Sequence, residues 1–414
     1  MNARPFISIA VDHYRPNRGG LESYIHRLTL ELIERDFRVQ ILTQTAEEVP
    51  KKAKVFLIAV PRHPRILREW LFIRRAIKLH IKSGFDIFYA VRHTPFADIY
   101  HPHGGLYSSA WASSLDLPAS PDSSQARRGR PAFFGSGQAR RGTPALSLLN
   151  KMMRFIKNLS PYRLLLCFFE RHLFLKSKSK LIIAVSDWIL EDIRHRFPHC
   201  KIPAVVLNNP VNLSFYQPSN DSERSFARAA LGISDEIVFL FAANNFRLKG
   251  LWTTLKTYQK LTRQYPDTIL LIAGRDKRRI FEDAISKLGL CGSQNIRFLG
   301  WQPDMRKIYH ASDIIVLPTR FDPMPVTLLE GAASRLPIIT SSQNGMAHFI
   351  KNTGAGFVVS DPHDTEGFFQ SMVKMMDPGL RKSIGQASFE MAQEFDEKNH
   401  FNKLIDLMKN ISPS

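Results

Sequence analysis

Two acidic residues, Asp322 and Glu330, lie eight positions apart in a stretch whose composition is typical of a ligand-binding segment. A run of branched apolar residues at 314–317 predicts a buried parallel strand, and 326–334 has the pattern of a helix. Asp322 would lie in the loop between them and Glu330 in the first part of the helix. Strand, polar loop and helix form a layout that binds ligands, although acids at a helix start commonly only complement the helix dipole.

A second strand and loop follow closely in the sequence. We expect a strand at 336–340 and a loop of small residues at 341–345. Both this loop and the one at 318–325 would leave the sheet at a strand end, so the two could share one crevice.

Two other stretches have the composition of anion-binding loops. Gly19 and Gly20 follow a predicted strand at 6–11 and open a helix, where backbone can approach a ligand and unpaired N–H groups can bind an anion. Arg247 and Lys249 lie between another predicted strand and helix, where cations can clamp a pyrophosphate. Taken singly, the glycines could form a plain tight turn and the basic residues a solvated surface.

Two histidines, His101 and His103, precede a pair of glycines after a strand-like stretch, which is typical of an active-site loop. Their i, i+2 spacing could suggest a metal, but no third ligand is apparent nearby. Any single histidine is more often structural. Gly274, just past a predicted strand at 268–273, marks one more loop at a strand end.

Length, charge and cysteine content narrow the class of protein. The 414 residues, 44% of them apolar, can form two domains of about 200 residues each. A net charge of +20 implies an anionic partner: nucleic acid, a phospholipid surface or a phosphorylated small molecule. The three cysteines are too few for a disulfide framework and lack metal-ligand spacing, which favours a reducing compartment. The first apolar run is too short for a signal sequence or a spanning helix, so we expect a cytoplasmic protein.

Strands and helices alternate along the whole chain, which predicts an α/β fold with two doubly wound domains. Strands are expected at 6–11, 38–43, 55–60, 86–91, 180–185, 237–242, 268–273, 296–299, 314–317, 336–340 and 356–359. Helices of the first half are expected at 21–34, 66–81 and 187–196. Asparagines and prolines near 206–218 break this pattern, which gives domains at 1–206 and 207–379, followed by helices within 380–414.

One segment does not fit a compact domain. Residues 113–147 are rich in Ser, Pro, Gly, Ala and Arg and contain QARRGRPA and QARRGTPA, so we predict a disordered insertion. A different mixture, of apolar and basic residues, occurs at 66–81 and again at 151–175. This mixture suits either an ordinary helix packed on a core or a helix that binds an anionic membrane surface.

The acidic pair and the glycine pair resemble motifs of the retaining GT-B glycosyltransferases of family 4, particularly its lipopolysaccharide core glucosyltransferases. Asp322 and Glu330 have the spacing of the acid-x7-Glu signature, with Asp where the family usually has Glu. The segment Gly19-Gly20-Leu21-Glu22 resembles the Gly-Gly-x-Glu loop of that family. The resemblance implies the GT-B fold, in which two Rossmann-like domains face each other across a cleft.

The basic loop resembles the same family in Lys249-Gly250, whereas Arg247 stands closer to the lysine than the arginine of the family does. Gly274 and Gly300 also match glycine positions of the family. These motifs follow the order of the family and cover most of the chain. In the family, the final helices cross back onto the first domain, and we expect the same here.

The resemblance also implies roles for the motif residues. Asp322 would lie by the donor sugar and Glu330 would hold the ribose hydroxyls. A histidine would contact the donor sugar, and we favour His103 over His101 because Gly104 beside it gives a ligand access to the backbone.

Other motif residues would bind the rest of the donor. Gly19 and Gly20 would lie near the diphosphate, with Lys249 and Arg247 as its cations, and Gly274 would line the nucleotide side. Pro325 carries no N–H, so a backbone contact to the sugar must come from Met324 or Val326.

The expected activity is retaining, metal-independent transfer of a hexose, with glucose favoured, from a nucleotide sugar such as UDP-glucose. The acceptor would be a cell-envelope glycan or glycolipid such as lipopolysaccharide core, reached at the inner face of the cytoplasmic membrane. No cofactor or metal is expected, because the sequence has no Asp-x-Asp motif to bridge a diphosphate through an ion.

Two alternatives remain from the sequence. A GT-B-like nucleotide-sugar epimerase would use the same donor site without a separate acceptor. A basic nucleic-acid-binding protein would account for the charge, but no RNP-type strand, zinc module or recognition-helix motif is present, so no specific nucleic acid partner is expected.

Overall fold

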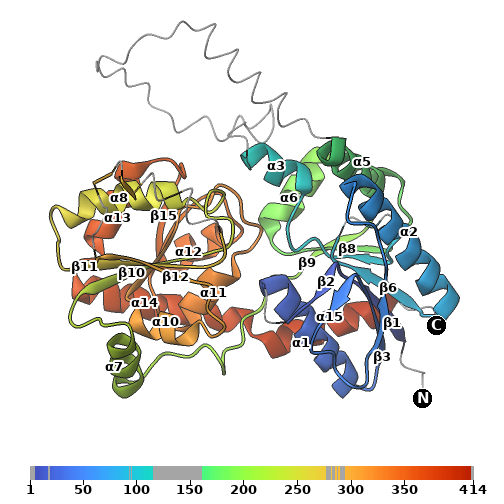
Figure 1. The fold of residues 1–414 in the computed structure, drawn as a ribbon, viewed down its shortest axis with the longest axis horizontal. Helices are drawn as coiled ribbons and strands as arrows, with labels where there is room; N and C mark the ends of the chain where they lie inside the picture. The colour runs from blue at the N-terminus through green and yellow to red at the C-terminus, as the bar shows by residue number, and fades with distance from the viewer. Residues whose placement is uncertain are drawn as a thin grey trace, which may run out of the picture.

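The computed structural model describes residues 5–16, 19–92, 94, 96–114, 161–276, 281, 285–286, 288–289 and 294–411. Within them, two α/β domains lie side by side (Figure 1). Nearly all of the insertion predicted at 113–147, and the first part of 151–175, lie outside the described residues.

The first domain is built on a parallel seven-stranded sheet with the order β5-β3-β1-β6-β7-β8-β9. Its strands are β1 (Phe6–Ala10), β3 (Arg38–Thr43), β5 (Lys54–Leu57), β6 (Ile87–Ala90), β7 (Ile99–Tyr100), β8 (Leu181–Ala184) and β9 (Ala204–Val206). A separate pair is formed by β2 (His13–Tyr14) and β4 (Thr45–Ala46). The helices are α1 (Gly20–Glu34), α2 (Arg65–Ser83), α3 (Tyr107–Ser114), α5 (Pro161–Lys176) and α6 (Asp187–Arg196).

Alternation along the strands explains how helices cover both faces of this sheet. In β1, Ile7 and Ile9 join the apolar cluster that contains α1, whereas Ala10 joins the cluster that contains α2. Successive side chains of a strand point to opposite faces, so a strand with apolar residues on both faces needs a helix on each.

The second domain is built on a parallel six-stranded sheet with the order β12-β11-β10-β13-β14-β15. Its strands are β10 (Ile237–Ala242), β11 (Thr268–Ala273), β12 (Ile296–Gly300), β13 (Ile314–Leu317), β14 (Ile338–Ser341) and β15 (Gly356–Val359). Its helices include α7 (Asp221–Ala230), α8 (Leu251–Thr262), α10 (Arg306–Ala311), α11 (Val326–Ala333), α12 (Ala347–Thr353), α13 (Thr365–Lys374) and α14 (Pro378–Ala392).

Both sheets reverse their strand order once, between β1 and β6 in the first domain and between β10 and β13 in the second. In open α/β sheets, ligands bind outside the carboxyl ends of the strands at this switch point. The prediction of two doubly wound domains is therefore confirmed, and each domain has its own place for a ligand.

The ends of β10 and β13 approach each other closely at Gly250. This residue has φ +85°, and a Cβ there would lie 2.0 Å from the Pro318 carbonyl oxygen. Only glycine fits, for two reasons. A side chain would clash with the Pro318 backbone, and the positive φ is a left-handed conformation that other residues rarely adopt. The loop that carries Lys249 is thereby held against the loop that carries Asp322.

The final helices differ from the expectation that both cross to the first domain. Helix α14 packs against α11 and α12 of the second domain, and Gly385 lets it lie close to the Arg335 carbonyl oxygen. Only α15 (Glu397–Ile411) joins the apolar cluster of the first sheet, through Phe401, Leu404, Ile405 and Met408. The red helix beneath the blue elements in Figure 1 is this crossing helix.

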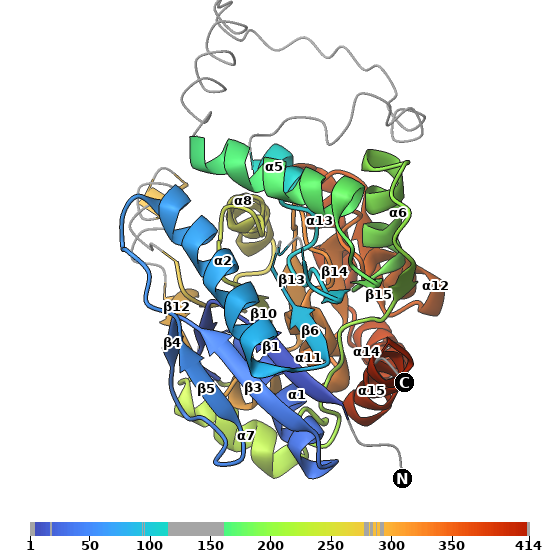
Figure 2. The ribbon, with the colours of Figure 1, turned by 90° about the vertical axis from the view of Figure 1, so that its right-hand side faces the viewer.

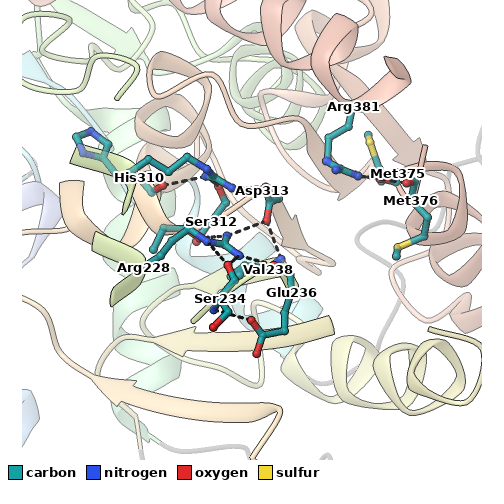
Figure 3. A network of polar contacts seen from close by, with 12 residues as sticks. Arg228, Ser234, Glu236, Val238, His310, Ser312, Asp313, Met375, Met376 and Arg381 are labelled. Atoms are coloured by element: carbon teal, nitrogen blue, oxygen red, sulfur yellow. Dashed lines mark hydrogen bonds and ion pairs between the residues drawn. The ribbon is translucent and has the colours of Figure 1, made fainter. Parts of the chain in front are cut away.

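An ionic network joins α7 to the residues at the amino ends of β10 and β13 in the second sheet (Figure 3). Asp313, just before β13, accepts hydrogen bonds from the Val238 N–H at 2.8 Å and from Arg224 at 2.6 Å. Arg228 donates to the backbone oxygens of Ser234 and Glu236 at 2.7 and 2.6 Å. These contacts stabilise the sheet at the end opposite the switch point. Among the described residues, no helix has the length and apolar composition needed to cross a bilayer.

Gly250→Ala should destabilise the protein by about 3 kcal/mol or more, since it adds both a backbone clash and a left-handed alanine. Gly84→Ala is the matched control, because Gly84 also has a positive φ, of +65°, but a Cβ there meets nothing within 4 Å. We expect that control to cost about 1 kcal/mol. Urea unfolding measures both, and equal losses would contradict the steric role of Gly250.

Candidate active site

Two adjoining cavities lie between the domains. The first, which we call the His103 pocket, has a volume of ≈ 330 Å³ and is lined by His103, Tyr24, Asn209, Lys249, Asp322 and Met324, among others. The second, the Glu330 pocket, has a volume of ≈ 390 Å³ and is lined by Gly19, Gly274, Trp301, Tyr216 and Glu330, among others. The two share Gly20, Arg27, Ala243, Asn244, Val326 and Thr327, so they form one continuous cleft.

Lys249 and Asp322 form an ion pair inside the His103 pocket. The Lys249 Nζ donates to Asp322 Oδ2 and also, at 3.2 Å, to the backbone oxygen of Phe321. Asp322 is 9% exposed, so this carboxylate is largely removed from water. Paired and hydrogen-bonded charges of this kind tolerate burial that a lone charge would not.

The two strand-end loops of the second domain meet at Asp322, as predicted. The Asp322 backbone N–H donates to the Gln343 backbone oxygen at 3.1 Å, and the Asp322 backbone oxygen accepts from the Gly345 N–H at 3.0 Å. The loop after β14 therefore supports the loop that carries the acid.

Glu330 lies in α11 at the floor of the Glu330 pocket. The Tyr309 hydroxyl donates to Glu330 Oε2 at 2.7 Å, and Tyr216 hydrogen bonds to the same carboxylate. Burial raises the pKa of Glu330, although both tyrosines and the charge of Arg27 act in the opposite direction. This acid is held in one orientation, with its charge partly balanced from the first domain.

The loop 321–324 is held by two hydrogen bonds, one from the first domain and one from the segment that links the domains. Ser186 Oγ donates to the Pro323 oxygen at 2.8 Å, and Asn209 Nδ2 donates to the Met324 oxygen at 3.0 Å. Gly345 permits this approach, since a Cβ there would lie 2.0 Å from the Pro323 oxygen.

His103 faces the cleft and is hydrogen-bonded through Nδ1 to Asn209 Oδ1 at 3.0 Å. The Asn209 amide donates to Met324, so its oxygen faces the ring and His103 must carry the Nδ1 proton. Desolvation, with the charge of His400, lowers the pKa of His103 to about 3. The ring is therefore neutral, and Nε2 is an acceptor with no partner among the described residues.

His101 and His400 lie behind His103 around Tyr24. His101 is fully buried, and its Nδ1 forms a hydrogen bond of 2.6 Å with the Tyr89 hydroxyl. It does not line the cleft. His400 contacts the Tyr24 hydroxyl through Nε2 and the Asn208 oxygen through Nδ1, both at 2.8 Å. Burial lowers the pKa of His101 well below its usual value and that of His400 to about 4.

Most residues named from the sequence come together in the cleft. Gly19, Gly20, Gly274, Met324 and Val326 all line it. Arg247 does not: it is exposed and lines neither cavity, because the turn before α8 points it outward while Lys249 points inward.

Sequence reasoning missed Arg27, which lines both cavities and forms an ion pair with Glu397. A signal was present, because Gly20, Tyr24 and Arg27 have the i, i+4, i+7 spacing of one helix face. Trp301 and Tyr216 were also missed, and they lie on loops where periodicity gives no direction. Within the described part of the chain, no group of three His, Cys, Asp or Glu residues is placed to hold a metal ion.

A third cavity lies in the first domain beside the cleft. This Glu69 pocket has a volume of ≈ 320 Å³, and its lining includes the apolar residues Phe72 and Ile73 of α2 and Leu166 and Phe169 of α5. Its charged residues, Glu69 and Arg92, pair at 3.0 Å. It shares Leu21 and Gly104 with the His103 pocket, so a molecule in one would adjoin a molecule in the other.

The buried histidines should make the protein less stable in acid. Histidine titrates near pH 6.5 when unfolded, whereas the folded pKa of His400 is about 4. Stability is therefore complete above pH 6.5 and falls as the pH drops, by about 2 kcal/mol for one such residue at pH 5. His400→Asn should reduce the difference between urea unfolding at pH 7 and pH 5 by this amount.

Tyr24→Phe is the control for this experiment, since it removes the hydrogen bond to His400 without removing a histidine. It should lower stability equally at both pH values. An unchanged pH dependence in His400→Asn would show that His400 is not held neutral.

Comparison with known proteins agrees with the fold and the cleft. Residues 223–391 match the family model described as Glycosyl transferases group 1. The lipopolysaccharide glucosyltransferase WaaG of Escherichia coli K12 is 25% identical over 242 residues, which are 58% of this chain and 62% of that protein. Spore coat protein SA of Bacillus subtilis 168 is 24% identical over 225 residues, 51% of this chain and 60% of its own length. The chain thus aligns with less than two thirds of these relatives.

Solved structures cover nearly the whole chain. The crystal structure of WaaG, a glycosyltransferase involved in lipopolysaccharide biosynthesis, superposes with a TM-score of 0.78 at 20% identity, over 97% of this chain and 99% of that one. Anabaena Alr3699/HepE, in complex with UDP and glucose, superposes with a TM-score of 0.67 at 14% identity, over 98% and 100%. Identities this low establish the fold alone. Residues 223–391 therefore match the group 1 glycosyl transferase family, and the chain has the two-domain GT-B fold.

Proposed function

We propose that the chain is a retaining, metal-independent glycosyltransferase that moves a hexose, glucose or a close relative, from UDP-glucose or a similar donor to a cell-envelope glycan such as lipopolysaccharide core. The observation that carries this proposal is the cleft itself, which joins the switch points of two Rossmann-like domains. The family of residues 223–391 supports the activity, and the similarity to WaaG supports the acceptor class.

The Glu330 pocket suits the nucleoside of the donor. The Glu330 carboxylate, fixed by Tyr309, can accept hydrogen bonds from ribose hydroxyls, and Trp301 at the rim offers a ring for a base. The UDP complex of the HepE structure supports uracil as the base. The diphosphate would then lie between the helix start at Gly20 and Lys249, where the two cavities join.

The His103 pocket suits the sugar. The neutral His103 can accept a hydrogen bond from a sugar hydroxyl through Nε2, and Asp322 can stabilise positive charge that develops on the ring. The acceptor oxygen attacks the anomeric carbon as its bond to the diphosphate breaks, and the acceptor proton passes to a leaving phosphate oxygen. Because Asp322 is paired with Lys249, we favour this internal return over attack by Asp322 itself.

The Glu69 pocket supports a transferase over an epimerase. A transferase needs a second site beside the donor sugar, whereas an epimerase does not. The Glu69 pocket provides such a site, and its apolar walls suit an acceptor that has an apolar portion.

The walls of the same pocket offer a surface for a membrane. Helices α2 and α5 are in contact and lie together at one side of the first domain (Figure 2). Their exposed apolar residues are Leu67, Trp70 and Ile81 on α2 and Leu164, Phe168 and Leu175 on α5. With the arginines and lysines of α2 around them, we propose peripheral binding to the anionic inner face of the cytoplasmic membrane.

A panel of UDP-, GDP- and ADP-sugars, each with and without a lipopolysaccharide core acceptor, tests the activity. We expect transfer from a UDP-sugar that depends on the acceptor. Product formed equally without acceptor would indicate an epimerase or hydrolase, and no binding of any nucleotide sugar would refute the proposal.

Glu330→Gln and Asp322→Asn should separate donor binding from chemistry. Loss of the Glu330 charge should weaken donor binding about tenfold, whereas Asp322→Asn should lower kcat about 100-fold with donor affinity within about threefold. Glu366→Gln, at an exposed acid of α13, is the matched control and should change neither. Unchanged kinetics in both site variants would refute the assignment.

Co-sedimentation with anionic vesicles tests the membrane proposal. The protein should bind phosphatidylglycerol vesicles at low salt, and Trp70→Ser with Phe168→Ser should reduce binding about tenfold. Phe226→Ser, at a residue of α7 that is 66% exposed on the second domain, should bind like the parent. No retention of the parent at low salt would reject the proposal.

A further inference from the structure

Arg27 is placed where the two halves of the cleft join. It extends from α1 of the first domain and lines both the His103 pocket and the Glu330 pocket. Among the described residues that line the cleft, Arg27 and Lys249 are the only arginine or lysine side chains. Arg27 comes from the first domain and Lys249 from the second, so the two cations lie on opposite sides of the place where the cavities join.

The guanidinium of Arg27 is not fully used by the protein. Its Nη1 donates to Glu397 Oε2, and its Nε has no hydrogen-bond partner among the described residues. An arginine has five N–H donors in a planar fork that fits phosphate oxygens. The Arg27 side chain is 27% exposed, so it remains accessible from the cleft while its Nη1 is paired with Glu397.

Glu397, which pairs with Arg27, lies at the start of the crossing helix α15. The Glu397 side chain is 16% exposed, and burial raises the pKa of its carboxyl group while the charge of Arg27 lowers it. His400, one turn later, hydrogen bonds to Tyr24 on α1 at 2.8 Å. Two contacts from α15 thus fix the face of α1 that lines the cleft.

The charge of the cleft explains why a second cation is needed there. The cleft acids are Asp322 and Glu330, and Lys249 is already paired with Asp322. The histidine that lines the cleft is neutral. A diphosphate brought beside these acids without further cations would be repelled, and with Arg247 turned to solvent the remaining cation is Arg27.

We propose that Arg27 binds the diphosphate of the donor from the side of the first domain and that Glu397 is a positioning residue that aims it. This rests on the function proposed above and extends it, because a phosphate contact from each domain would make donor binding draw the domains together. Arg27 would also balance the charge that gathers on the diphosphate as the sugar departs.

Binding of UDP and of uridine to four variants tests the proposal, with the matching guanine or adenine pair if the panel selects another base. Arg27→Gln should weaken UDP binding about 10- to 100-fold and leave uridine binding within about twofold, since uridine carries no phosphate. Arg27→Lys should recover part of the loss. Glu397→Gln should weaken UDP binding less than Arg27→Gln, again without changing uridine binding.

Arg35→Gln is the matched control. Arg35 caps the C-terminus of α1 and also contacts α15, through Asn402 at 2.5 Å, but it does not line the cleft. It should leave both affinities unchanged, which separates loss of a phosphate contact from loosening of α15. If the parent binds UDP and Arg27→Gln binds it equally, or loses uridine to the same extent, Arg27 does not bind the diphosphate and only this inference fails. If the parent binds no nucleoside diphosphate, the proposed function fails with it.

Discussion

The loop that carries Asp322 is hydrogen-bonded by the opposite domain and by the segment that links the domains, and the geometry of the cleft depends on these bonds. Ser186 and Asn209 donate to the successive backbone oxygens of Pro323 and Met324, immediately after the acid. A loop has little stiffness of its own, so hydrogen bonds to a second rigid body are what fix its course. The same Asn209 orients His103, so the acid of one domain and the histidine of the other are set by one shared amide. Separation of the domains would break both the Ser186 bond to the loop and the His103 bond to Asn209.

Around this junction, ionisable groups are either paired or kept neutral. Lys249 pairs with Asp322 and Arg27 with Glu397, while desolvation keeps the three histidines uncharged. Buried charge is costly unless it is compensated, and a neutral ring avoids the cost altogether. Such a cleft is stable by itself, yet it keeps hydrogen-bonding groups in fixed directions for a ligand. Such preorganisation is how a protein site can stabilise charge that develops on a bound ligand.

The sequence predicted the sheets well and the side-chain directions poorly. Strands such as Thr268–Ala273 and Ile314–Leu317 are continuous apolar runs that only a doubly covered parallel strand explains, and the structure has them at those residues. Two-residue β7 is too short to leave a pattern, and α14 differs from α15 in its packing partner, which local periodicity does not encode. In the cleft, Lys249 and Arg247 are two positions apart and have the same chemistry, but the turn at Gly250 sends them to opposite sides. Arg27 could have been found from its helix face, whereas Glu397 could not, because its partner lies 370 positions away.

The crossing helix has a consequence for how the protein is made. Phe401, Leu404, Ile405 and Met408 complete the apolar cluster on one face of the first sheet, yet they leave the ribosome only after the whole second domain has been synthesised. Until then, the face of β1 and α1 that receives them is uncovered, and an uncovered apolar face invites association with chaperones or other nascent chains. The second domain carries its own closing helix, α14, which packs against α11 and α12. The first domain is therefore expected to complete its core only after the second domain has been synthesised.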